Sequence, residues 1–125
     1  SAKFKRLFGA DADESVQAKF RVVKLAGTTL SDNEIKTKVI KAFNNYFNVS
    51  NWEFGENFYF TELSSYVHQQ LSGVIGSIII VPKNNSGKFG DLFQIKAESN
   101  EFFVNTAKVS DIEIIDKITK TTLAN

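Results

Sequence analysis

Residues 61–81 read TELSSYVHQQLSGVIGSIIIV, a helical pattern followed directly by a strand pattern. Leu63, Val67 and Leu71 recur at four-residue steps, so they share one face of a helix that we expect over residues 61–72. Gly73 suits the left-handed position that ends many helices. Residues 74–81 are β-branched and almost continuously apolar, which predicts a central strand buried on both faces. A helix leading into a buried strand indicates a domain of mixed helix and sheet.

A second helix is expected upstream of this segment, over residues 31–47. Ser31 and Glu34 have the spacing of a capping box, and Leu30 and Ile35 have that of a hydrophobic staple. The apolar residues of this helix recur at three- and four-residue steps: Ile35, Val39, Ala42, Phe43, Tyr46 and Phe47. Residues 19–25, KFRVVKL, predict the first strand, and residues 48–60 predict a strand or extended segment.

The two ends of the chain have weaker patterns. Short β-like runs at residues 92–97, 101–105 and 111–116 follow a turn-rich loop over residues 82–91, which predicts a C-terminal β meander. Residues 1–18 indicate an N-terminal tether, because an apolar spacing breaks at Gly9 into an acidic polar stretch. The sequence therefore predicts a single α+β domain over residues 19–125, with a mixed or antiparallel sheet and two helices packed on one of its faces.

Composition excludes several classes of protein. The 125-residue chain has a net charge of +1, which gives no long-range field to concentrate nucleic acid. It has no cysteine, which excludes disulfides, thiolate nucleophiles and cysteine-based metal sites. Its longest apolar run, residues 78–81, is far shorter than the roughly 20 residues of a membrane-spanning helix. The chain has no methionine and begins with Ser1, so we expect its natural start to lie upstream.

The sequence contains no convincing catalytic constellation. Its one histidine, His68, stands beside the apolar face of a predicted helix, where histidine is normally a boundary or surface residue. No calcium-loop or phosphate-loop spacing is present. Two acidic groups fit a polar tether and the solvent side of a strand: Asp11, Asp13 and Glu14, and Asp111, Glu113 and Asp116. We therefore expect no enzyme activity, no cofactor and no metal.

Aromatic residues are abundant, with 12 Phe, 3 Tyr and 1 Trp. Such residues dominate both protein cores and protein interfaces, and the sequence leaves both roles open. The contact surface is expected in the crowded segment over residues 52–60 or in the C-terminal strands. The candidate interface residues are Trp52, Phe54, Phe58, Tyr59 and Phe60. Because the sequence has no convincing catalytic constellation, we expect the protein to work by contact with other subunits.

Residues 44–82, NNYFNVSNWEFGENFYFTELSSYVHQQLSGVIGSIIIVP, resemble the baseplate J-like wedge proteins of contractile-tail phages. In that family a helix with an L-x-x-Y/A-V/I-H run leads through a glycine into a strand, a pattern matched here by Leu63, Tyr66, Val67, His68, Gly73 and Val74. Residues 90–115 are similar to the C-terminal end of the larger, T4-type wedge protein.

The resemblance implies a structural protein without enzyme activity, located in the tail baseplate of a virion and assembled in the host cytoplasm. Its partners would be copies of itself, as a homodimer or ring, and other baseplate proteins. An alternative function is a small ligand-binding or nucleic-acid-binding module, in which Lys19, Arg21 and Lys24 face phosphates.

Overall fold

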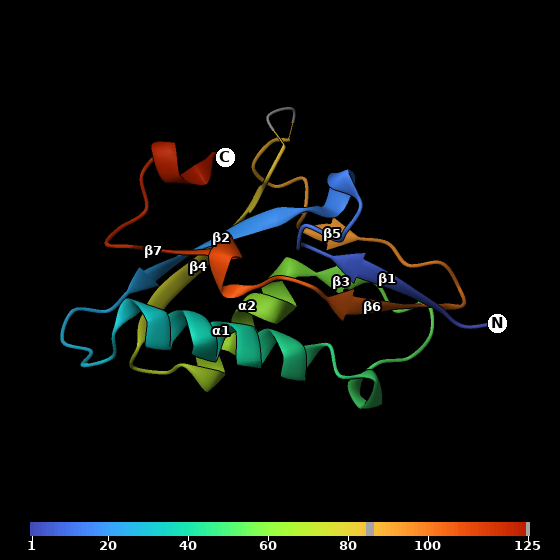
Figure 1. The fold of residues 1–125 in the computed structure, drawn as a ribbon, viewed down its shortest axis with the longest axis horizontal. Coiled ribbons are helices and arrows are strands. Elements are labelled where there is room, and N and C mark those ends of the chain that lie inside the picture. The colour runs from blue at the N-terminus through green and yellow to red at the C-terminus, as the bar shows by residue number, and fades with distance from the viewer. Residues whose placement is uncertain (85–86, 125) are drawn as a thin grey trace.

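The computed structural model describes residues 1–84 and 87–124, which form an α+β fold (Figure 1). The predicted fold class is therefore confirmed. The helices are α1 (Asp32–Tyr46) and α2 (Phe60–Gln70). The strands are β1 (Lys3–Leu7), β2 (Ala18–Lys24), β3 (Phe58–Tyr59), β4 (Ile75–Pro82), β5 (Gln94–Ile95), β6 (Glu101–Asn105) and β7 (Ile112–Ile115).

The largest sheet has the strand order β4-β2-β7, with β2 antiparallel to β4 and parallel to β7. Both helices pack on the face of this sheet that carries Phe20, Val22 and Ile80, as the sequence predicts. The prediction that residues 74–81 form the central strand is wrong, because β4 lies at the edge of this sheet and β2 lies at its centre. An apolar run shows that both faces of a strand are covered, and it carries no information about the strand's neighbours.

The N-terminal tether is also a wrong prediction. β1 pairs in parallel with β6, and Leu7 and Phe8 at its end are completely buried. Phe8 holds the next segment in place through backbone hydrogen bonds, donating to the carbonyl of Val16 and accepting from the amide of Ala18, at 2.9 and 3.0 Å. The apolar residues of this segment fill part of the core, so the domain begins with β1.

The C-terminal strands do not form the predicted meander. β5 pairs with β3, β6 pairs with β1, and β7 pairs with β2, so the three strands belong to three different sheets (Figure 1). Two of these pairings are parallel and join segments from opposite ends of the chain. Turn residues between strands indicate where a strand ends, but they do not determine which strand it pairs with.

The predicted helices agree closely with the structure. Ser31 caps α1 and forms the expected reciprocal capping box with Glu34. Gly73 follows α2 with a φ of 81°, the left-handed conformation expected of it. Residues 48–60 form a short 3-10 turn, Val49–Asn51, and the two-residue strand β3 in place of one extended strand. Residues 85 and 86 of the predicted loop lie outside the described part of the chain.

The core is built around phenylalanine rings. Phe8 lies at the centre of one group, with its ring centroid 5.0 Å from that of Phe20 and 5.6 Å from that of Phe58. Phe43 and Phe47 from the end of α1 complete the group, at 6.4 and 6.0 Å from Phe8. Much of the aromatic content is therefore core, and the remaining rings define the candidate sites.

Candidate functional site

The structure does not gather the five predicted interface residues on one surface. Phe58 is fully buried and Phe60 is 7% exposed, so neither is available to a partner, which corrects the prediction for these two residues. The cause is strand alternation at β3, which turns Phe58 into the core and Tyr59 outward. Trp52 is partly buried against the core. Phe54 and Tyr59 are exposed.

Phe54 belongs to an aromatic surface that we call the Phe4 patch, which consists of Phe4, Phe54 and Phe102. The ring of Phe102 lies 4.2 Å from that of Phe54 and 5.9 Å from that of Phe4. Phe4 and Phe102 are cross-strand partners on the parallel pair β1 and β6. The exposed fractions of Phe4 and Phe54 are 57% and 53%. Three phenylalanine rings thus meet at the surface of this small sheet.

Tyr59 belongs to a second surface, the Phe93 patch, which consists of Tyr59, Phe89 and Phe93. The rings of Phe89 and Phe93 lie 5.2 Å apart, and Phe93 stacks on the buried Phe60 at 5.6 Å. The Tyr59 hydroxyl accepts a 3.4 Å hydrogen bond from Gln94 on the neighbouring strand β5. All three residues of this patch are exposed.

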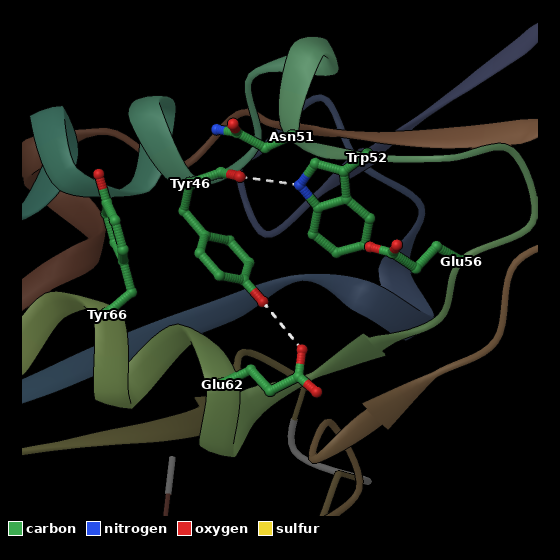
Figure 2. A pocket seen from close by; sticks show the side chains of 6 residues that line it. All are labelled: Tyr46, Asn51, Trp52, Glu56, Glu62 and Tyr66. Atoms are coloured by element: carbon green, nitrogen blue, oxygen red, sulfur yellow. Dashed lines mark hydrogen bonds between the residues drawn. The ribbon is translucent and has the colours of Figure 1, made fainter.

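Trp52 lines a pocket of about 350 Å³ at the end of α1 (Figure 2). We call it the aromatic pocket, and its lining residues are Tyr46, Asn51, Trp52, Glu56, Glu62 and Tyr66. The Tyr46 ring lies 5.5 Å from that of Trp52 and 5.6 Å from that of Tyr66. In Figure 2 the three rings form a row, with the Glu62 carboxylate below Tyr46 and the Glu56 carboxylate beside Trp52.

Local structure fixes the walls of the aromatic pocket. Trp52 follows the 3-10 turn Val49–Asn51, and its indole N–H donates to the Tyr46 carbonyl at 2.8 Å. The same indole stacks on Phe47 at 5.5 Å. Glu62 and Tyr66 stand one turn apart on α2. The Tyr46 hydroxyl donates to Glu62 at 3.4 Å. Burial raises the pKa of the Tyr46 phenol, and the nearby carboxylates of Glu62 and Glu56 raise it further.

The basic residues of the alternative hypothesis are engaged within the chain. Arg21 is buried, pairs with Glu113 at 3.1 Å and donates to the carbonyls of Thr122 and Ala124. Lys19 approaches the same glutamate at 3.9 Å. Lys24 pairs with Asp32 at 3.0 Å. Contact with a phosphate backbone would have to compete with these ion pairs.

Several of the titratable residues weighed for catalysis have structural partners. The ring nitrogens of His68 face the carbonyls of Ser64 and Gly76, at 2.8 and 3.3 Å. Asp111 is buried and pairs with Lys83 at 2.6 Å. Asp13 caps a 3-10 turn, and hydrogen bonds from the hydroxyl and amide of Ser15 hold the pKa of its carboxyl below the usual range.

Within residues 1–84 and 87–124, no three His, Asp or Glu side chains come together as a possible metal site. Over the same residues, no helix has the length and apolar character needed to cross a membrane. No protein-family model matches the sequence, and no curated protein matches it significantly.

Sequence reasoning missed most residues of the three aromatic sites. It identified Trp52, Phe54 and Tyr59, and it missed Phe4, Phe102, Phe89 and Phe93, which join the patches through strand pairing and loop packing. The two glutamates of the aromatic pocket come from a loop and from α2, and nothing in their spacing indicates that they line one cavity.

Proposed function

We propose that this chain is a non-enzymatic assembly domain that binds a second copy of itself through the Phe4 patch. The resemblance to baseplate J-like proteins supports a role in the wedge of a contractile phage tail, with other baseplate subunits of the virion as the proposed partners. The observation that carries the proposal is the cluster of Phe4, Phe54 and Phe102 at the surface.

The Phe4 patch has the chemistry of the centre of a protein interface. Buried aromatic residues are enriched at such centres, while charged residues are depleted there. Phe4 and Phe54 each expose more than half of their surface, at 57% and 53%. Covering about 100 Å² of one such ring contributes about 2.5 kcal/mol. A twofold interface would cover the same patch on both subunits and so double this contribution.

The test is the absolute mass of the chain by light scattering after gel filtration, over a concentration series. We expect the natural chain to form a dimer or larger species that dissociates on dilution. The double substitution Phe4→Ser and Phe54→Ser should weaken association by more than about tenfold, because it removes most of the apolar contact. A matched control, Phe89→Ser with Phe93→Ser, changes the Phe93 patch instead.

Two outcomes would contradict the proposal. One is a monomer of the natural chain at every concentration. The other is an oligomer that persists in the Phe4 and Phe54 double variant while circular dichroism shows an unchanged fold. If only the Phe93 patch control lost the oligomer, the interface would be assigned to the Phe93 patch instead.

A further inference from the structure

The aromatic pocket has a chemistry that the assembly proposal does not use. Its walls are the rings of Tyr46, Trp52 and Tyr66, and its charged groups are the carboxylates of Glu56 and Glu62 (Figure 2). Among the described residues, no basic side chain lines it. Aromatic faces attract cations through their quadrupole, and the carboxylates add negative charge at the same place. The pocket is therefore complementary to an organic cation.

The two carboxylates are free to bind such a cation. Within the described residues, neither Glu56 nor Glu62 forms an ion pair, although five other ion pairs are present. The Glu56 carboxylate accepts no hydrogen bond from these residues, and Glu62 accepts only the long bond of 3.4 Å from the Tyr46 hydroxyl. Most of the acceptor capacity of both groups remains available in the pocket.

The chemistry of the lining selects among cations. A metal ion requires several converging oxygen ligands, and two carboxylates among aromatic rings are a poor set for it. A quaternary ammonium group could contact the rings but has no N–H to donate to the glutamates. A guanidinium group is planar, stacks on aromatic rings and carries five N–H donors that match carboxylate oxygens. Of these three cations, guanidinium is the one that satisfies both the aromatic rings and the carboxylates of the pocket.

The pocket is also preorganised, because hydrogen bonds and ring contacts hold its walls in place without a ligand. The Trp52 indole is fixed by its hydrogen bond to the Tyr46 carbonyl and by stacking on Phe47. The Tyr46 ring is held between those of Trp52 and Tyr66. Little side-chain freedom is lost when a ligand enters a site of this kind, so even a small group can bind measurably.

We propose that the aromatic pocket binds the guanidinium group of an arginine side chain on a partner protein. The guanidinium plane packs against the aromatic rings, and its N–H groups donate to Glu56 and Glu62. The inference is independent of the Phe4 patch, because it depends only on the pocket residues. A free arginine-like molecule carries the same cation, and the experiment distinguishes this source from a protein side chain.

The test uses N-acetyl-L-arginine amide as the probe and the whole chain as the receptor. Trp52 is the only tryptophan, so its fluorescence reports occupancy of the pocket directly. We expect a saturable change with a dissociation constant of about 1–10 mM, as the size of the probe allows. Binding should weaken as salt is added, because part of the attraction is electrostatic.

Matched variants distinguish binding in the pocket from a general effect of the net charge. Glu62→Gln and Glu56→Gln should each weaken binding by roughly two- to fivefold, and together by about tenfold or more. Glu53→Gln removes the same charge from an exposed residue of the same loop that does not line the pocket, and it should bind like the natural chain. The shift of the Tyr46 ring signals in NMR provides a second measure of occupancy.

Comparison probes identify the group and its source. Tetramethylammonium should bind several-fold more weakly, because it cannot donate hydrogen bonds; equal binding would overturn the guanidinium assignment. Free L-arginine has the same net charge as the blocked probe but carries an α-ammonium and a carboxylate that an arginine within a protein lacks. Equal or weaker binding of free L-arginine supports a protein side chain as the source, and tighter binding would overturn that assignment. Absence of saturable binding, or unchanged binding in the Glu56 and Glu62 double variant, would overturn the proposal as a whole.

Discussion

Replacement of Phe8 by alanine tests whether the N-terminal segment belongs to the core. The Phe8 ring is completely buried, with the rings of Phe20, Phe43, Phe47 and Phe58 at 4 centroid distances between 5.0 and 6.4 Å. Removal of a buried phenylalanine ring costs about 3–5 kcal/mol, from lost burial and from the cavity that remains. Phe8 has a φ of 81°, a conformation as unfavourable for alanine as for phenylalanine, so the substitution relieves no backbone strain.

This loss is large for a chain of 125 residues, whose total free energy of unfolding is expected to be about 6–19 kcal/mol. Urea unfolding followed by circular dichroism measures it, and the midpoint should fall by about 2 M. Phe89→Ala provides the control, since Phe89 is 47% exposed and lies outside the Phe4 patch, and it should cost less than about 1 kcal/mol. A loss below about 1 kcal/mol for Phe8→Ala would refute the assignment of this segment to the core.

Three further changes test other parts of the structure. Ser31→Ala removes the capping box of α1 and should lower the free energy of unfolding by about 1 kcal/mol, measured in urea. Arg21→Met removes the bonds to Glu113 and to the C-terminal carbonyls, and it should lower the free energy of unfolding by about 1–3 kcal/mol. The segment that follows Asp116 should then be cleaved by proteases faster than in the Ser31→Ala variant. Because the pKa of Tyr46 is higher in the folded state than in the unfolded state, the neutral phenol stabilises the fold. This contribution is fully present below about pH 10, the ordinary pKa of tyrosine, and is lost as the pH rises through the pKa of the folded state. Tyr46→Phe should therefore reduce the loss of stability at alkaline pH. Tyrosinate absorbance, compared between the two proteins during a pH titration, should show that Tyr46 ionises above the ordinary pKa of tyrosine.

Local signals in the sequence predict the helices and the two long strands. The capping box at Ser31 and the glycine at position 73 act over a few residues, so they can be recognised without the rest of the fold. The apolar patterns of β2 and β4 likewise reflect burial on the pleated sheet. These elements account for the predicted α+β class and for the packing of both helices on one face.

Strand partners could not be predicted in the same way. β1 pairs with β6 across nearly the whole chain, and its short KFKRL sequence is mostly polar. Its contribution to the core comes from Leu7 and Phe8 at its end, where Gly9 makes the chain turn. A Cβ at Gly9 would clash with the carbonyl oxygen of Thr106, so the close packing of these two distant segments requires a glycine at position 9. The sequence shows the glycine but not the carbonyl it meets.

The candidate sites could be predicted only in part, because they too depend on contacts between segments that are distant in the sequence. Aromatic crowding over residues 52–60 is visible in the sequence, but only tertiary packing separates the buried rings of this segment from its exposed ones. Phe58 and Phe60 enter the core, whereas Phe54 joins Phe102 from another strand. The glutamates of the aromatic pocket look like ordinary solvated residues in the sequence. Their convergence depends on the approach of α2 to the loop after α1.

One loop, residues 52–56, contributes to both proposed binding features. Trp52 and Glu56 line the aromatic pocket, and Phe54 between them belongs to the Phe4 patch. An apolar patch supplies burial without strong directionality, whereas a guanidinium held between two carboxylates fixes orientation. A partner that engaged both would therefore gain affinity from the Phe4 patch and a fixed orientation from the aromatic pocket. If one partner does so, Glu56→Gln should leave the oligomer mass unchanged at high concentration but speed dissociation, whereas the Phe4 and Phe54 double variant should remove the oligomer itself.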